Sequence, residues 1–378
     1  MKQFLLIVLL CAFPLNAFSQ LLVNADVIVT PTANSTAKGN AIIANKNERG
    51  DSPFNLWRSE IFATWSMSPM FTTYANFLFD AKMKSGDLKR NRPFRVDGLY
   101  LEGRPDSAFN FLVGKIPYLV GNFPARRFAG TNPLIGRPLM YSFKTPLTGG
   151  TIIDSLQLAA NRDAFIPGIA PIEEAYWNDG IALLGDISGV RWSATGTRNS
   201  LSNPNVQRSL TNQLAGHLGT TLSDNLDIGV SAGKGGYLEN VRTVRHEFIG
   251  ADVRYEYWRY EFIGEAQKHT WDAPFITDKK LLAFSYYGEF RYQFSGSVHF
   301  LSRLEQLLFG DIKKKKGEIS WGYDVTRLEA GLWYRFSTLL FKGVWQRTLV
   351  ATLPESSRDV YAVQLVYRWD DIFKMKEE

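Results

Sequence analysis

The chain has almost no cysteine and no long apolar segment. Cys11 is its single cysteine, and it lies in a stretch that we expect to be removed. The mature chain could then form no disulfide and would offer no thiol as a nucleophile or metal ligand. Beyond the N-terminal region, no stretch reaches the roughly 18 uninterrupted apolar residues that a helical membrane span needs. The sequence therefore excludes cysteine chemistry and a helical membrane protein.

The excess of one charge sign is also small. Lys and Arg number 43 against 37 Asp and Glu, which gives a formal net charge of +6. A nucleic-acid-binding protein would need a clustered basic face, so we expect no nucleic-acid partner. A mild basic excess fits attraction of small anions or contact with the phosphates of lipopolysaccharide.

The N-terminal residues have the pattern of a signal peptide. A lysine is followed by an apolar run from Phe4 to Phe13 and by the small residues Ala17 and Ser19. The run is too short to cross a bilayer, which takes about 20 residues. We therefore predict that residues 1–19 are a signal peptide and that the protein is exported.

Most of the remaining sequence alternates apolar with polar residues. Ile61, Ala63 and Trp65 fall on one face of an expected strand, and Arg58 and Glu60 fall on the other. Such segments recur at lengths of about ten residues, which suits a tilted transmembrane strand. The composition is 14% aromatic. This pattern predicts strands with one face toward lipid and the other toward water.

The expected strands form hairpins with short turns, separated by longer polar connections. Seven hairpins are expected. A first strand near 21–30 and a last strand over 359–369 bring the total to about sixteen strands. A polar tail over 370–378 is expected after the last strand. We predict an all-β, transmembrane antiparallel β-barrel as a single domain over 20–378, in the outer membrane of a Gram-negative cell. The expected hairpins, after one on either side of a turn at Met67–Met70, are 94–103 with 108–116, 177–185 with 189–198, 209–222 with 226–236, 246–256 with 258–268, 281–293 with 297–308, and 322–336 with 338–350.

The last expected strand is rich in aromatic residues. Tyr361, Tyr367 and Trp369 alternate with Gln364 and Arg368, so the aromatic side chains would face lipid and the polar ones the lumen. An aromatic terminal strand resembles the signal that the barrel-assembly machinery reads. We therefore expect that machinery to be a partner.

One connection, over about 117–174, is far longer than the others. Loops beyond about 15 residues are usually functional or disordered, and this one is too apolar for simple disorder. A barrel of about sixteen strands is too wide for its side chains alone to fill. We expect the loop to fold inward and narrow the bore.

Here the chain resembles the outer-membrane porins, both the general porins and the phosphate-selective porins O and P. The likeness lies in the strand rhythm, in the long third loop, and in Val113-Gly114-Lys115 followed by Gly121-Asn122-Phe123-Pro124. It implies that the third loop forms the constriction. Porins of this kind are usually trimers, which implies a homotrimer, whereas a complete aromatic girdle would favour a monomer; the sequence leaves both open.

Three arginines of the long loop are the candidate constriction residues. Arg126, Arg127 and Arg137 lie in a stretch without any acidic residue from Gly121 to Gly150. If the loop lines the pore, their charges would attract anions in a low-dielectric frame. The alternative is that they bind carbonyls and wall carboxylates to hold the loop.

Charged residues on the expected inner faces are the candidate wall residues. Several are two apart in sequence, which keeps both on one face of a strand, and lipid exposure near the bilayer centre would cost about 2 to 4 kcal/mol for each Arg or Lys. They therefore face water, either to meet solute or to tie the wall together. The set is Arg58, Asp252 and Arg254, Glu265, Glu289 and Arg291, Arg303, and Arg327 and Glu329.

The expected function is a diffusion channel for small hydrophilic solutes with a bias to anions, without metal, cofactor or chemical step. A barrel adhesin or scaffold with a plugged bore is the alternative. A barrel hydrolase is less favoured, because the spacing of His299 and Ser302 puts them on opposite faces of a strand. The run Lys313–Lys316 would lie in an external loop, either solvated or against lipopolysaccharide.

Overall fold

A computed structural model gives the architecture of the chain. It describes residues 20–30, 32–34, 57–80, 94–106, 108–143, 145–148, 151–152, 169–172, 178–198, 200, 202, 212–238, 241, 244–274, 276–277, 280–314, 317–351 and 358–376. The predicted signal peptide, residues 1–19, lies outside the described residues, as does much of the long connection.

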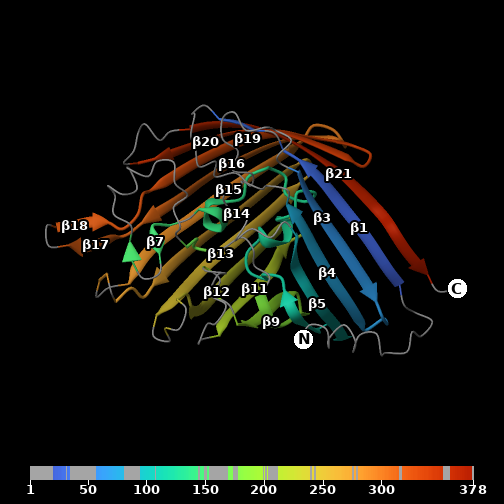
Figure 1. Cartoon of the computed structure of the whole chain (residues 1–378), viewed down its shortest axis with the longest axis horizontal. Coiled ribbons are helices and arrows are strands. Elements are labelled where there is room, and N and C mark those ends of the chain that lie inside the picture. Colours follow the sequence, from blue (N-terminus) through green and yellow to red (C-terminus); the bar gives the residue numbers. More distant parts are fainter. Residues whose placement is uncertain are drawn as a thin grey trace.

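Sixteen antiparallel strands form one closed barrel, as the alternation of apolar and polar residues predicted. Figure 1 shows them side by side as one tilted, curved wall. The barrel strands are β1 (Gln20–Val29), β3 (Trp57–Ser66), β4 (Phe71–Asp80), β5 (Phe94–Asp106), β6 (Phe109–Ile116), β9 (Asn178–Ile187), β10 (Val190–Thr197), β11 (Gln213–Ser223), β12 (Leu226–Gly236), β13 (Arg245–Tyr257), β14 (Tyr260–Trp271), β15 (Leu281–Gln293), β16 (Val298–Phe309), β19 (Val325–Phe336), β20 (Leu339–Val350) and β21 (Arg358–Lys376).

Smaller elements lie in the connections. The long third connection contains η2 and α2, and its pair β7 and β8 forms a separate two-stranded sheet. Another separate hairpin, β17 and β18, lies between β16 and β19, and β17 includes Lys313 and Lys314 of the predicted lysine run. These elements are β2 (Thr32–Asn34), η2 (Pro124–Arg126), α2 (Leu139–Ser142), β7 (Leu147–Thr148), β8 (Thr151–Ile152), β17 (Asp311–Lys314) and β18 (Gly317–Ser320).

The first and last strands close the barrel. β1 pairs with β3 on one side and with β21 on the other, where Val27 lies opposite Tyr367. The sequence predicted a polar tail after Trp369, and this was wrong, because β21 continues to Lys376, which lies opposite Gln20. The tail is strand because the beginning of β1 offers it backbone hydrogen-bonding partners.

Short turns alternate with longer connections, as predicted. Two residues connect β9 to β10, β11 to β12, and β13 to β14. One predicted turn was placed too early. Gly103 to Ser107 was expected to form it, whereas β5 continues to Asp106, with an irregularity in its pairing to β6 between Gly103 and Asp106.

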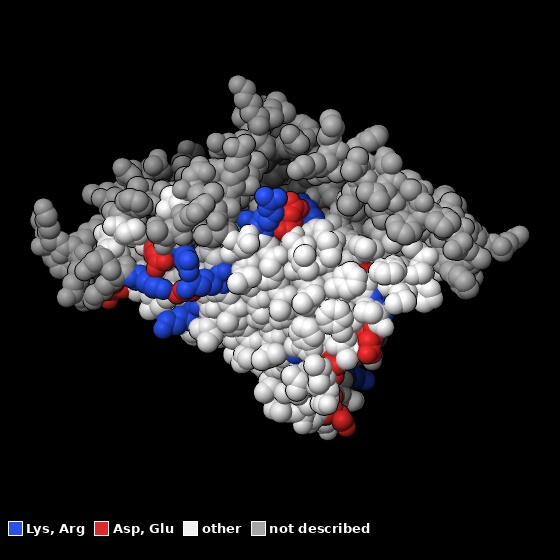
Figure 2. Space-filling view, turned by 90° about the horizontal axis from the view of Figure 1, so that it is seen from below, with Lys and Arg blue, Asp and Glu red and all other residues white. Residues whose placement is uncertain are grey.

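Apolar side chains cover the outer face of the wall. On β16, Leu304 is 50% exposed while its neighbours Arg303 and Glu305 have no exposed surface. The same alternation places Tyr361 and Trp369 outward on β21 and buries Gln364. Figure 2 shows a broad white outer wall with charged side chains gathered toward its edges. This band suits contact with lipid hydrocarbon.

The largest apolar cluster lies between the long third connection and one end of the wall. It joins Leu139, Leu147 and Ile169 of that connection to strand residues such as Trp271 and Val325. The described part of the connection therefore buries apolar side chains against the wall. No helix among the described residues is long and apolar enough to cross a membrane.

The outer face gives a first prediction. Leu332 is 54% exposed on β19, so Leu332→Arg should lower the free energy of unfolding by about 2 to 4 kcal/mol if the residue lies near the bilayer centre. Denaturant titration of the reconstituted barrel measures it. Thr64→Arg, on the inner face and partly exposed, is the matched control and should cost less; equal losses would contradict the assignment of the two faces.

Candidate functional site

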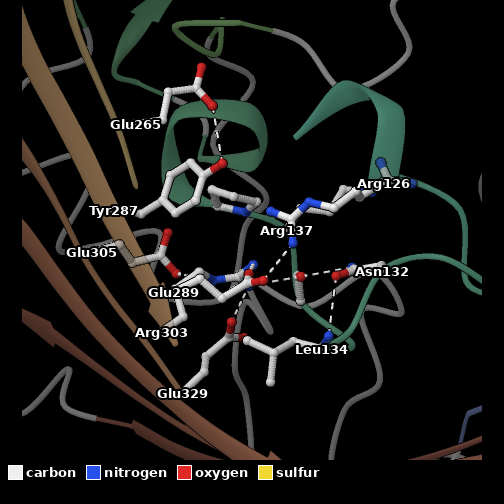
Figure 3. Close-up of polar contacts among 12 residues, drawn as sticks. Arg126, Asn132, Leu134, Arg137, Glu265, Tyr287, Glu289, Arg303, Glu305 and Glu329 are labelled. Carbon is white, nitrogen blue, oxygen red and sulfur yellow. Dashed lines mark hydrogen bonds and ion pairs between the residues drawn. The ribbon is translucent and has the colours of Figure 1, made fainter. Parts of the chain in front are cut away.

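A buried network of ion pairs occupies the inner face of β15, β16 and β19. The Arg303 guanidinium lies 3.4 Å from Glu289 and 3.4 Å from Glu305, and it also contacts Glu329. Nε of Arg327 lies 2.6 Å from Glu305. All five side chains are at most 3% exposed. Figure 3 shows Arg303 among Glu289, Glu305 and Glu329. Charges buried this deeply are stable only when paired, so loss of one member of the network would leave another buried charge without a partner.

The pairing runs mainly between strands. The sequence predicted pairs two residues apart, and Arg303 with Glu305 has that spacing. Arg254, however, contacts Glu261 across the β13–β14 hairpin at 2.9 Å, and it lies 3.0 Å from Glu256 on its own strand. Glu261 is diagonal to Arg254 in the register. In the buried network Arg303 lies directly opposite Glu289 and Glu329, and such residues are closer than residues two apart on one strand. Of the predicted two-residue pairs, Arg303 with Glu305 forms, whereas Asp252 contacts His217 and Arg291 contacts Glu261.

The network binds the backbone of the third connection. Nη2 of Arg303 donates to the carbonyl oxygen of Gly136 at 2.8 Å. The amide of Leu139, at the start of α2, donates to Glu305. One side of this segment is thus held by the wall charges rather than by solvent.

Lys342 of β20 holds a second part of the same connection. Its ammonium donates to the carbonyl oxygens of Ala129 and Asn132, each at 2.6 Å, and to Oε1 of Gln364 at 3.0 Å. These three acceptors use all three of its N–H groups. Lys342 is fully buried, and the sequence alternation placed it on the inner face without marking it as important.

Glu265 of β14 holds a third part. Its carboxylate accepts hydrogen bonds from the hydroxyls of Tyr141 at 2.5 Å and Tyr287 at 3.1 Å, from Nε2 of Gln267 at 2.6 Å, and from the amide of Asn122 at 3.3 Å. Burial and the nearby carboxylate hold the pKa of Tyr141 well above its usual value, so the phenol remains a donor. This acid therefore holds α2 and the segment just before η2 against the wall.

The three candidate arginines also lie against the wall. Arg126 pairs with Glu289 at 2.6 Å, and Arg127 pairs with Asp97 of β5 at 2.5 Å. The side chain of Arg126 is 19% exposed and that of Arg127 only 7%. Arg137 is buried, and its carbonyl oxygen accepts from a wall guanidinium. Of the three, Arg126 has the most exposed side chain.

The remaining predicted wall residues lie on the inner face too. Arg58 is 2.9 Å from Glu60 on its own strand. Asp252 meets His217 of β11, whose Nε2 is 3.0 Å from the carboxylate. Arg291 contacts Glu261 at 2.7 Å. Each therefore belongs to a local pair and not to the buried network.

Near the short-turn end, most ion pairs have the arginine more exposed to the lumen than the acid. The sequence did not predict this arrangement. Glu256, 56% exposed beside Arg254, is the exception. Alternation could identify such arginines as inward-facing, although only the register reveals which acid covers each one. The pairs, with the exposed fractions of the two side chains, are Arg104–Glu102 (51% and 12%), Arg191–Asp227 (51% and 34%), Arg254–Glu261 (45% and 9%), Arg291–Glu261 (28% and 9%) and Arg368–Asp26 (37% and 2%).

The structure places His299 and Ser302, the pair considered for a hydrolase, on opposite faces of β16. No group of three or more His, Cys, Asp or Glu residues in the described part of the chain could hold a metal ion. The ring of His299 stacks on Trp333 with centroids 5.0 Å apart, and Trp333 lies opposite it in the register. Ser302, an odd number of residues along the strand, points to the other face.

The comparisons identify the fold. No protein-family model and no curated sequence matches the chain. Among solved structures, an anion-selective porin from Comamonas acidovorans matches with a TM-score of 0.58 and 9% identity over 93% of this chain and 98% of its own. The porin OmpF of Salmonella typhi matches with a TM-score of 0.59 and 9% identity over 92% and 97%. A loop-deletion mutant of OmpT, an outer membrane protein of Vibrio cholerae, matches with a TM-score of 0.58 and 11% identity over 93% and 99%. The chain therefore has the sixteen-stranded barrel fold of outer-membrane porins.

Proposed function

We propose that the protein is a porin-type diffusion channel for small hydrophilic solutes in the outer membrane of a Gram-negative cell. The apolar outer face and polar inner face suit a barrel with lipid outside and water inside. The fold shared with porins supports the same placement. On this proposal residues 1–19 direct export, residues 20–378 form one domain, and the barrel-assembly machinery and outer-membrane lipid are partners; a homotrimer is the expected assembly.

We propose further that the connection over 117–174 folds inward as the constriction. Barrels of 16 to 18 strands leave an aqueous channel unless something narrows it. The hydrogen bonds of Asn122, Ala129, Gly136 and Leu139 to inner-face side chains support this placement. In this arrangement Arg126 lies at the edge of the remaining passage and Arg127 and Arg137 hold the connection.

One observation carries the proposed preference for anions: the short-turn ion pairs present their guanidiniums to water. A dissolved ion in the lumen meets Arg104 and Arg191 before the more buried Glu102 and Asp227. Low-dielectric walls focus the field of such charges and raise the local concentration of anions. The preference should weaken as salt rises, because the screening length falls to about 8 Å at physiological ionic strength.

Ion selectivity in planar bilayers tests this function. The reversal potential of the wild type in a salt gradient should indicate anion preference. The triple variant Arg104→Gln, Arg191→Gln and Arg254→Gln leaves its carboxylate partners uncompensated, so the reversal potential should move toward cation preference and change sign.

Arg259→Gln is the matched control, because Arg259 lies in the β13–β14 turn, over the ring of Trp258 at 4.8 Å. It removes one positive charge near the same end, as each single change of the triple variant does, and its reversal potential should stay at the wild-type value. A cation-selective wild type, or a triple variant that keeps the parent potential, would refute the proposed origin of selectivity.

A second function is favoured by the depth of the buried network. Arg303, Arg327, Glu305 and Glu329 have no exposed side-chain surface, so the third connection seals that part of the bore. If it seals the rest as well, the barrel is a non-conducting adhesin or scaffold. Wild-type protein that shows no channel activity, while a variant lacking the connection conducts, would select this function.

A further inference from the structure

A group of cations lies on the outer, lipid-facing side of the wall at its long-connection end. Lys234 of β12 and Lys280, just before β15, both contact the carboxylate of Glu247 on β13. Lys280 also lies 3.6 Å from Asp272. Each lysine side chain is 49% exposed. The carboxylates gather the lysines into one place without covering them.

Two further cations in this group have no carboxylate partner among the described residues. Lys268 of β14 is exposed and lies opposite Ile249 and Phe284 in the register. Those two apolar side chains are 62% and 39% exposed on the outer face. Arg245, at the start of β13, is exposed as well, and its hydrogen bonds with Asp272 are made by its backbone amide and carbonyl groups.

Lys268 lies near the edge of the apolar outer band. It lies eight residues beyond Tyr260, about 27 Å along the strand from the short turn, and therefore toward the far edge of the apolar band. A lysine here can extend its ammonium along the wall to the membrane surface. Because this ammonium lies next to lipid and has no carboxylate partner within the described ranges, an anion from the membrane could bind it.

The charge of the group favours such an anion. Lys234, Lys268, Lys280 and Arg245 carry four positive charges, and Glu247 and Asp272 carry two negative ones. Phosphate groups accept strong charge-assisted hydrogen bonds from ammonium and guanidinium groups. In Figure 2, charged side chains gather at the edge of the white outer wall, where lipid headgroups would begin.

We infer that Lys234, Arg245, Lys268 and Lys280 form a binding site for the phosphates of an outer-leaflet lipid headgroup. Its acyl chains would lie on Ile249 and Phe284 below. The site is separate from the lumen and would anchor the barrel in depth and rotation. The inference rests on the proposed outer-membrane location, but it does not require that the barrel conducts.

The test measures lipid binding by the purified full-length mature protein in detergent. Native mass spectrometry would count adducts of lipid A that carries two phosphates, over a titration. The double variant Arg245→Gln and Lys268→Gln should bind it about 25-fold more weakly, because each cation near an anionic lipid contributes about fivefold. Glu247→Gln removes a competing carboxylate and should bind more tightly than wild type.

Three comparisons keep the result specific. Arg259→Gln, at the opposite end of the same β13–β14 hairpin, should bind as wild type does. Lipid A stripped of its phosphates should bind wild type and the double variant equally. Equal affinity of wild type and double variant for the phosphorylated lipid would overturn the site, and displacement by millimolar inorganic phosphate would assign it to a free anion. Conductance, measured separately on the same preparation, reports on the channel proposal alone.

Discussion

Removing residues 358–378 should abolish assembly of the barrel. β21 pairs with β20 over its first half and with β1 over most of its length. Its loss leaves two open edges in a sheet of fifteen strands, whose unpaired N–H and C=O groups cannot be satisfied within hydrocarbon. The expected result is no heat-modifiable band on gels and no protein in the outer membrane.

The β17–β18 hairpin supplies the matched control. It forms a separate two-stranded sheet that pairs with no barrel strand. Replacing residues 311–320 with a short flexible linker removes a segment of strand from the chain without opening the barrel. This variant should assemble. A truncated chain that still gives a heat-modifiable barrel would mean that closure does not depend on β21.

The barrel could be predicted from the sequence because its rules are local. A period of two decides which face each side chain takes, so Leu304 and Leu332 could be placed outward and Arg303 inward without knowledge of any neighbour. Short turns could be placed from their residue types. The continuation of β21 to Lys376 could not, because it depends on pairing with Gln20 at the other end of the chain.

The site could be predicted only in part, for the same reason. Arg126, Arg127 and Arg137 stood out as cations in a stretch without acids. Their partners lie far away in sequence, with Glu289 separated from Arg126 by 163 residues. No local sequence feature indicates that Glu265 accepts a hydrogen bond from Tyr141. The same is true of the hydrogen bond that Lys342 donates to the carbonyl oxygen of Asn132. Such contacts follow from the register and from the path of the long connection.

Replacing residues 120–143 with a short Gly-Ser linker should raise the single-channel conductance several-fold. Most contacts between this segment and the wall run through side chains of the wall, chiefly Glu265, Arg303, Glu305 and Lys342. The wall itself is closed by backbone pairing that the replacement leaves intact. Water can hydrate the inner charged side chains that the replacement exposes, so these side chains do not need the lost partners.

The same replacement should shift selectivity toward cations. The segment takes with it Arg126, Arg127 and Arg137, and it uncovers three cations of the wall against six acids. The uncovered cations are Arg303, Arg327 and Lys342, and the acids are Glu60, Asp97, Glu265, Glu289, Glu305 and Glu329. The newly opened surface therefore carries three negative charges in excess.

Single-channel recording in a salt gradient measures both effects on one preparation. Shortening the β17–β18 hairpin, which is outside the barrel sheet, should change neither conductance nor reversal potential. A replacement variant whose conductance equals that of wild type would show that residues 120–143 do not limit the passage. A larger pore that keeps the parent reversal potential would instead place the charges that select ions entirely at the short-turn end, with Arg104 and Arg191.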